Sequence, residues 1–223
     1  MSLAPGSDRV LVKVCGLTSP ADALACAEAG ADWIGLNFHP DSPRFVSIAL
    51  AAEIVAALPT SCKAVGLFVN RPSAEVADVS AQIGVATVQL HGDEPVEILA
   101  ELAHFQVVRA FRLGDRSAIE RMSEFLRLAH VRGVPPFAIL IDGHVAGQAG
   151  GTGRAIAGDL LDELPPLSLR RLILAGGLTP ENVAERVNRV RPWMVDVASG
   201  VETSPGRKDL DRVAAFIRAV RGA

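Results

Sequence analysis

The chain has no tyrosine, and aromatic residues make up only 4% of its 223 residues, although 49% are hydrophobic. Alanine, valine and leucine supply most of this hydrophobic content. Such a composition is typical of layered α/β proteins and argues against an all-β fold. The chain is long enough to bury a full hydrophobic core.

The sequence also lacks an excess of basic residues, because its formal net charge is -3 at pH 7. This balance argues against a nucleic-acid partner and against a membrane surface, so local groups would have to hold an anionic ligand. No apolar run reaches the roughly 18 to 20 residues of a membrane span. The first residues contain no apolar signal-peptide segment. We therefore expect a cytoplasmic protein.

Cysteine is scarce, and the three residues present, Cys15, Cys26 and Cys62, have no paired zinc-binding spacing. An odd number of unpaired cysteines is expected of a reduced intracellular protein. No two histidines form an H-x-x-x-H pair, so we expect no metal site.

Strand-like and helix-like segments alternate along the whole chain, with no linker or low-complexity tract between them. The expected strands are Val10–Cys15, Trp33–Phe38, Ala64–Val69, Thr87–Leu90, Val107–Leu113, Phe137–Ile141, Leu172–Leu174 and Met194–Ala198. Near-continuous apolar strands, each followed by a helix, indicate a parallel sheet covered on both faces.

Eight such units favour a single-domain α/β protein with a closed (β/α)₈ TIM barrel over residues 1–223. We expect residues 1–8 to form a flexible N-terminal extension. The alternative is an open Rossmann-like sheet, but the first strand-to-helix turn, "CGLTSP", lacks the G-x-G-x-x-G pattern.

In such barrels the active site lies where the strands end. Six side chains of suitable chemistry stand at or just after expected strand ends: Cys15, His39, Arg44, His91, Arg112 and Asp142. The seventh and eighth turns are rich in small residues, with Gly176-Gly177 in one and Ser199-Gly200 in the other. Because barrels of this kind often bind phosphate at these two turns, a phosphorylated small molecule is the favoured ligand.

The seventh turn also carries a helix-start signal, with Thr179 as the expected N-cap and Pro180 as the first helical residue. Such an N-terminus would add partial positive charge beside the glycines.

Each candidate has a structural alternative when it is taken singly. Cys15 could serve only packing, Asp142 could be a turn residue and Arg44 a solvated loop arginine. Lys13, two residues before Cys15, has no evident partner in the sequence, and we interpret it as structural.

Taken together, the motifs resemble one known family. The segments "VKVCGLTSPADALACAEAGADWIGLNFHPDSPRFVS", "VGLFVN", "VQLHGDE", "IDGHVAGQAGGTG", "LAGGLTPENV" and "VDVASGVETSPGRKD" follow one another as they do in phosphoribosylanthranilate isomerase, a (β/α)₈ enzyme of tryptophan biosynthesis. The resemblance extends over nearly the whole chain from about Val10.

The resemblance implies an Amadori rearrangement of N-(5-phosphoribosyl)anthranilate to 1-(o-carboxyphenylamino)-1-deoxyribulose 5-phosphate. It implies that Cys15 is the general base and Asp142 the general acid, and that no cofactor takes part. Substrate-binding residues would be Arg44 at the anthranilate carboxylate, with Gln89, His91 and Asp196 also on the substrate side. Phosphate would be bound by backbone N–H groups at Gly176, Gly177, Ser199 and Gly200.

Other functions remain open at this stage. The closest alternative is a related phosphosugar aldose-ketose isomerase that uses substrates of both the histidine and the tryptophan pathway. An epimerase-like or aldolase-like barrel would require paired acids, metal-binding histidines or a Schiff-base lysine. A non-catalytic binding module is the third. Buried and exposed apolar helix faces look alike in sequence, so no oligomeric state is predicted.

Overall fold

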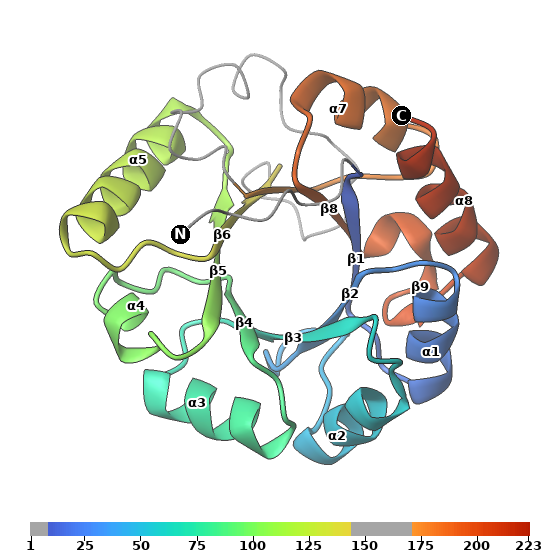
Figure 1. The fold of residues 1–223 in the computed structure, drawn as a ribbon, viewed down its shortest axis with the longest axis horizontal. Coiled ribbons are helices and arrows are strands. Elements are labelled where there is room, and N and C mark those ends of the chain that lie inside the picture. Colours follow the sequence, from blue (N-terminus) through green and yellow to red (C-terminus); the bar gives the residue numbers. More distant parts are fainter. Residues whose placement is uncertain (1–8, 144–170) are drawn as a thin grey trace.

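The computed structural model describes residues 9–143 and 171–223, and within them eight parallel strands close into a barrel. Each strand pairs with the next along the chain, and β1 closes the barrel against β8 (Figure 1). The strands are β1 (Leu11–Cys15), β2 (Trp33–Asn37), β3 (Lys63–Phe68), β4 (Thr87–Leu90), β5 (Gln106–Arg112), β6 (Ala138–Asp142), β7 (Leu172–Ala175) and β8 (Met194–Val197). The expected barrel is therefore confirmed.

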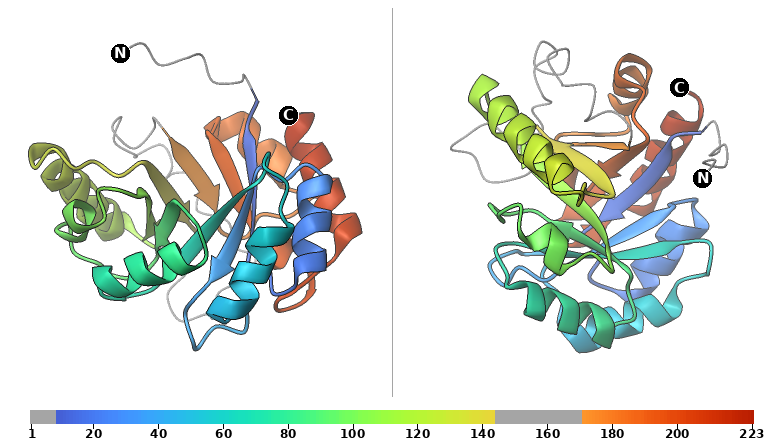
Figure 2. Two further views of the ribbon diagram at one scale, coloured as in Figure 1. Left: turned by 60° about the horizontal axis from the view of Figure 1, so that its bottom comes forward. Right: turned by 60° about the vertical axis from the view of Figure 1, so that its left-hand side comes forward.

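Helices surround the barrel and cover its outer face (Figures 1 and 2). They are α1 (Pro20–Glu28), α2 (Ile48–Ala57), α3 (Ser73–Gln82), α4 (Ile98–Glu101), α5 (Arg116–Val131), α7 (Val183–Val190) and α8 (Leu210–Arg221). Local signals set several of their starts, because Ser19 and Ser47 each accept a hydrogen bond from a first-turn N–H. In α5 the buried residues recur every three or four positions, so one stripe faces the strands.

Two groups of buried residues result from the alternation of side chains along each strand. Outward-facing residues, such as Val12 and Val14 of β1, pack with the helices in the larger cluster. Inward-facing apolar residues fill the barrel in a second cluster that includes Trp33, Val108 and Leu140. Because the interior is filled there, the barrel is a packed core and not a channel.

On β6 and β8 the inward-facing positions change from apolar to polar along the strand. On β6, Ala138 and Leu140 belong to the interior cluster, and the next inward position is Asp142. On β8, Met194 is followed two residues later by Asp196. On these strands, polar side chains lie at the carboxyl end, and the apolar side chains nearer the amino end pack in the barrel interior.

The expected helix start in the seventh turn is wrong. α7 begins at Val183, and Pro180 lies in the turn that precedes it. The Asn182 side chain closes this turn, since its Oδ1 accepts from the Thr179 N–H and its Nδ2 donates to the Gly177 carbonyl. The Thr179 carbonyl already accepts from the Val183 N–H, but regular helical geometry begins only at Val183.

The structure contains one hairpin that was not predicted from the sequence, and two parts of the chain are not described. A two-stranded antiparallel hairpin, β9 (Glu202–Ser204) with β10 (Arg207–Lys208), interrupts the segment between β8 and α8 and was not predicted. Residues 1–8, for which an N-terminal extension was expected, and residues 144–170 lie outside the described residues. Among the residues in the two described ranges, no helix is long and apolar enough to cross a membrane.

Two thiols outside the barrel interior give a test of the packing. Burial raises the pKa of Cys26 and of Cys62 to about 12, so both thiols stay protonated in the folded chain when an unfolded thiol ionises, above about pH 8.5. Above that pH the unfolded state binds fewer protons than the folded state, so the free energy of unfolding should fall as pH rises. The slope should approach about 1.4 kcal/mol per pH unit for each thiol.

Urea unfolding of the wild type and of Cys26→Ala from pH 7.5 to 10.5 would measure this. The alanine variant should lose stability less steeply with pH, whereas its cost from lost packing should be independent of pH. Equal slopes in the two proteins would show that Cys26 ionises in the folded chain.

Candidate active site

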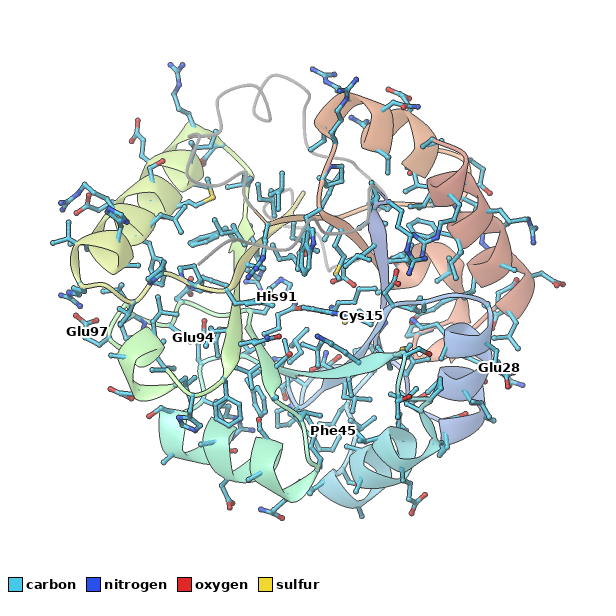
Figure 3. The ribbon with its side chains drawn as sticks, in the orientation of Figure 1. Cys15, Glu28, Phe45, His91, Glu94 and Glu97 are labelled. Carbon is cyan, nitrogen blue, oxygen red and sulfur yellow. The ribbon has the colours of Figure 1, made fainter. Side chains whose placement is uncertain are left out.

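The residues proposed from the sequence meet in one place. A cavity of about 450 Å³ opens where the barrel strands end, and His39 and Arg112 are among the residues that line it. It is also lined by all ten residues to which the family resemblance assigns a role: Cys15, Arg44, Gln89, His91, Asp142, Gly176, Gly177, Asp196, Ser199 and Gly200. Figure 3 shows two of them, Cys15 and His91, near the middle of the barrel. The sequence interpretation therefore found residues that share a site, although they come from six strands or the turns that follow.

Cys15 ends β1, and its side chain faces the cavity from a buried position. Burial raises the pKa of this thiol, while the ammonium groups of Lys13 and Lys208 act to lower it. The neighbouring strand makes room for the sulfur at Gly35, where an added Cβ would lie 2.6 Å from Sγ. The positive charge that a thiolate needs is present, from two lysines rather than from a helix end.

Lys13 is not without a partner, contrary to the sequence interpretation. Its Nζ lies 2.8 Å from Oδ2 of Asp196, and both side chains are almost fully buried. Barrel closure creates the pair, because Lys13 is opposite Asp196 in the register of β1 against β8. Burial alone would lower the pKa of Lys13, but Asp196 and Cys15 raise it, so the ammonium stays charged. Oδ1 of Asp196 is buried with no hydrogen-bond partner among the residues described.

Asp142 ends β6 and lies beside His91, with 3.5 Å between Oδ2 of the acid and Nε2 of the imidazole. The other ring nitrogen, Nδ1, is 3.0 Å from Nε2 of Gln89. An amide nitrogen only donates, so His91 accepts at Nδ1 and carries its proton on Nε2, toward Asp142. Gly176 allows this approach, since a Cβ there would lie 2.6 Å from Oδ1 of Asp142. Gln89 and His91 therefore form a chain of contacts that ends at the Asp142 carboxyl.

Arg44 follows β2, and its guanidinium is bound side-on by Glu202 of the hairpin. Nε lies 2.9 Å from Oε1 and Nη2 lies 2.5 Å from Oε2. Lys208, also in the hairpin, donates to Oε1 of Glu202 and to the Cys15 carbonyl, each over 2.6 Å. Burial acts to raise the pKa of Glu202, but hydrogen bonds from Arg44 and Lys208 outweigh it and lower that pKa.

Glu202 and Lys208 were missed as site residues. Both stand in the quoted segment "VDVASGVETSPGRKD", and a Glu and a Lys on either side of a Ser-Pro-Gly turn were the available signal.

The two glycine-rich turns pack against each other. Gly176 and Gly177 both have positive φ, at 86° and 64°, and a Cβ at Gly200 would overlap the Leu178 carbonyl. Within the described part of the chain, the backbone N–H groups of Gly176, Gly177, Ser199 and Gly200 donate no hydrogen bond. Unpaired N–H groups gathered at one end of a cavity are a suitable anion site.

The described residues contain no group of three or more His, Cys, Asp or Glu side chains that could hold a metal ion. The groups that line the cavity are instead two acids, a thiol, two arginines, two histidines and backbone N–H groups. These define the class of the protein as a (β/α)₈-barrel enzyme with an acid-base site at the carboxyl ends of its strands.

Comparison with known proteins gives the family. The model of the N-(5'phosphoribosyl)anthranilate (PRA) isomerase family matches residues 12–219. The chain belongs to this family. An N-(5'-phosphoribosyl)anthranilate isomerase of Geobacter sulfurreducens is 45% identical over 213 residues, which are 96% of this chain and 99% of the relative. One from Pseudomonas fluorescens is 42% identical, with 94% and 97% covered.

Solved structures agree with this result. Phosphoribosyl anthranilate isomerase from Thermotoga maritima superposes with a TM-score of 0.82 at 35% identity, covering 96% of this chain and all of that one. A phosphoribosyl anthranilate isomerase in complex with reduced 1-(o-carboxyphenylamino)-1-deoxyribulose 5-phosphate gives a TM-score of 0.80, with the same identity and coverage.

The close fit of Cys15 against Gly35 gives a test of the site geometry. A Gly35→Ala variant should displace the thiol, because the new methyl group would lie 2.6 Å from Sγ. The rate of Cys15 alkylation by iodoacetamide should change about threefold, which corresponds to about 0.7 kcal/mol. Mass spectrometry of the labelled peptide would measure it.

Gly66→Ala is the matched control. Gly66 lies on β3, and an added Cβ would meet the Phe68 ring at 2.9 Å and not the thiol. That variant should label at the wild-type rate. Unchanged labelling in Gly35→Ala would show that the sulfur has room to move.

Proposed function

We propose that this chain catalyses the Amadori rearrangement of N-(5-phosphoribosyl)anthranilate, with Asp142 as general acid and Cys15 as general base. The observation that carries the proposal is that both side chains line one cavity of a full-length member of the isomerase family. They come from β1 and β6, so they reach a bound substrate from different sides of the barrel.

The two groups divide the reaction between them. Asp142 protonates the ribose ring oxygen, and the bond from C1′ to that oxygen breaks to give a protonated Schiff base. Cys15, as thiolate, removes the proton from C2′, and the electron pair moves to form an enolamine. Tautomerisation of the enolamine gives the ketone, and the proton taken by Cys15 balances the one given by Asp142. No oxidant or reductant is consumed.

The ends of the substrate would be held by separate groups. The guanidinium of Arg44 meets the anthranilate carboxylate, and the free N–H groups of the two glycine-rich turns meet the phosphate. Oδ1 of Asp196, buried and without a partner in the described chain, would accept a hydrogen bond from a ribose hydroxyl. The ribose is thereby positioned between acid and base.

The surroundings of the two proposed catalytic groups bear on these roles. Burial raises the pKa of the Cys15 thiol and so keeps most of it protonated at pH 7, while Lys13 and Lys208 counter this effect by favouring the thiolate. His91 lies beside the Asp142 carboxyl, with 3.5 Å between Nε2 and Oδ2, and positions it in the cavity. All three cysteines are free thiols, which fits the reducing cytoplasm where we place this biosynthetic enzyme.

A fluorescence assay tests the proposal. Phosphoribosylanthranilate generated in the cuvette should lose its fluorescence in the presence of the enzyme, at a rate proportional to enzyme concentration. The isomerase substrate of the histidine pathway, which carries two phosphates, should give no turnover. Turnover of both substrates would support the dual-substrate alternative, and turnover of neither would refute the proposed activity.

Substitution of each catalytic group tests its role. Cys15→Ala and Asp142→Asn should each lower kcat by about 10²- to 10⁴-fold, the usual contribution of a positioned acid or base, with little change in KM. Steady-state kinetics would measure both constants. The controls are Cys26→Ala, a thiol buried away from the cavity, and Asp211→Asn, on the exposed face of α8. A near-normal kcat in either catalytic variant would assign that role to another residue.

A further inference from the structure

The contact between Arg44 and Glu202 uses a particular edge of the guanidinium. Both oxygens of Glu202 bind the edge formed by Nε and Nη2, over 2.9 and 2.5 Å. A guanidinium carries five N–H bonds, and this contact occupies two of them. The two N–H groups of Nη1 and the second N–H group of Nη2 donate to no residue in the described ranges. The edge left open is therefore the one formed by Nη1 and Nη2.

Glu202 is held in place independently of Arg44. Its Oε1 accepts from Lys208 Nζ over 2.6 Å and from the Gly206 N–H over 3.3 Å, and only 3% of its side chain is exposed. Lys208 Nζ also donates to the carbonyls of Cys15 and Ala198, so its three protons are all used. Lys208 thus fixes Glu202 and has no donor left for a ligand.

The hairpin that carries Glu202 is itself fixed to the neighbouring loops. Thr18, after β1, donates its hydroxyl to the Gly206 carbonyl over 2.6 Å. Gly206 also lies against the loop before Arg44, since an added Cβ would be 3.4 Å from the Pro43 carbonyl. The stem of Arg44 passes directly over Gly16, where a Cβ would overlap Cδ. The guanidinium is therefore constrained at its stem and at one edge.

The charges leave room for a second carboxylate. Arg44 and Lys208 together carry two positive charges against the single negative charge of Glu202. A ligand carboxylate can bind the open edge of Arg44 without displacing Glu202, because the two carboxylates would occupy different edges of the same planar group.

We propose that Glu202 is a positioning residue that makes the site selective for a carboxylate on the substrate's aromatic ring, by holding Arg44 with its Nη1–Nη2 edge toward the cavity. This inference rests on the proposed function, in which Arg44 meets the anthranilate carboxylate. It adds that the hairpin, and not Arg44 alone, determines the recognition of that group.

A pair of ligands that differ only in the ring carboxylate tests whether Glu202 makes the site selective for that group. The first is reduced 1-(o-carboxyphenylamino)-1-deoxyribulose 5-phosphate, and the second is the same compound without the carboxyl group. Isothermal titration calorimetry would give the Kd of each. The wild type should bind the carboxylated ligand at least about tenfold more tightly, as expected for one charge-assisted pair. In Glu202→Gln this preference should fall to about twofold or less, with the Kd of the second ligand unchanged within about twofold.

Glu202→Gln is nearly isosteric. Its amide oxygen can accept from only one of the two cations, Arg44 or Lys208, and its amide nitrogen repels the other. Glu97→Gln is the matched control. Glu97 also pairs with an arginine, Arg132, over 2.5 Å, but it is exposed at the periphery of the molecule (Figure 3). The Glu97→Gln variant should show the same preference for the carboxylated ligand as the wild type.

A coupling measurement separates positioning from a general structural role. In an Arg44→Ala background, adding Glu202→Gln should leave the preference unchanged, because Glu202 acts through Arg44. Should Glu202→Gln fail to fold by circular dichroism, Glu202→Asp replaces it. This variant keeps the charge but is too short to reach both Nε and Nη2, so the preference should still decrease.

Three results would overturn the inference. One is an unchanged preference in Glu202→Gln, and another is equal weakening of both ligands. The third is tighter binding of the carboxylated ligand, which would show that Glu202 competes for Arg44 instead of orienting it. A wild type that binds neither ligand would refute the proposed function itself, which is distinguishable from these three.

Discussion

The closure of the barrel between its first and last strands is the constraint on which the site depends. Closure sets β1 beside β8, and in that register Lys13 meets Asp196, 183 residues away in the chain. Two charged groups so deeply buried are tolerated only because each compensates the other. The same closure brings the hairpin after β8 to the end of β1, where Lys208 binds the Cys15 carbonyl. Both ends of the chain thus build the surroundings of one thiol.

The surroundings of Cys15 reconcile an acidic protein with an anionic ligand. The chain has a net charge of -3, yet Lys13, Lys208 and Arg44 all act on this sulfur, and two carboxylates, Asp196 and Glu202, compensate them. One positive charge remains from these five groups. Lys13 and Lys208 act through the field at the thiol, because both are buried and paired with carboxylates, whereas Arg44 keeps one edge open toward a ligand.

The features predicted correctly from sequence were those with local causes. The eight strands follow from short apolar runs, each of which is visible within a few consecutive residues. The location of the site followed from a general rule about barrels. The local signal was inexact at Thr179 and Pro180, because regular helix begins at Val183, after a turn that the Asn182 side chain closes.

The pairs that were missed join residues far apart in the chain. Arg44 and Glu202 are 158 residues apart, and no periodicity or spacing connects them. Their contact depends on the barrel order, on a hairpin of five ladder residues and on the absence of a side chain at Gly16. Each condition is set by packing across elements, which a single sequence does not encode as a pattern.

The distribution of these two ion pairs also gives the proposed base and the proposed acid different surroundings. Cys15 lies between the Lys13–Asp196 pair and the Lys208–Glu202 pair, whereas Asp142, on the far side of the cavity, lies 3.5 Å from the His91 imidazole. Cations therefore gather at the thiol for which we propose the loss of a proton. A barrel permits this separation because its strands bring their end residues into one cavity from opposite sides, while each keeps its own neighbours. The opposite proton demands of the two proposed roles can thus be met by different neighbours within one cavity.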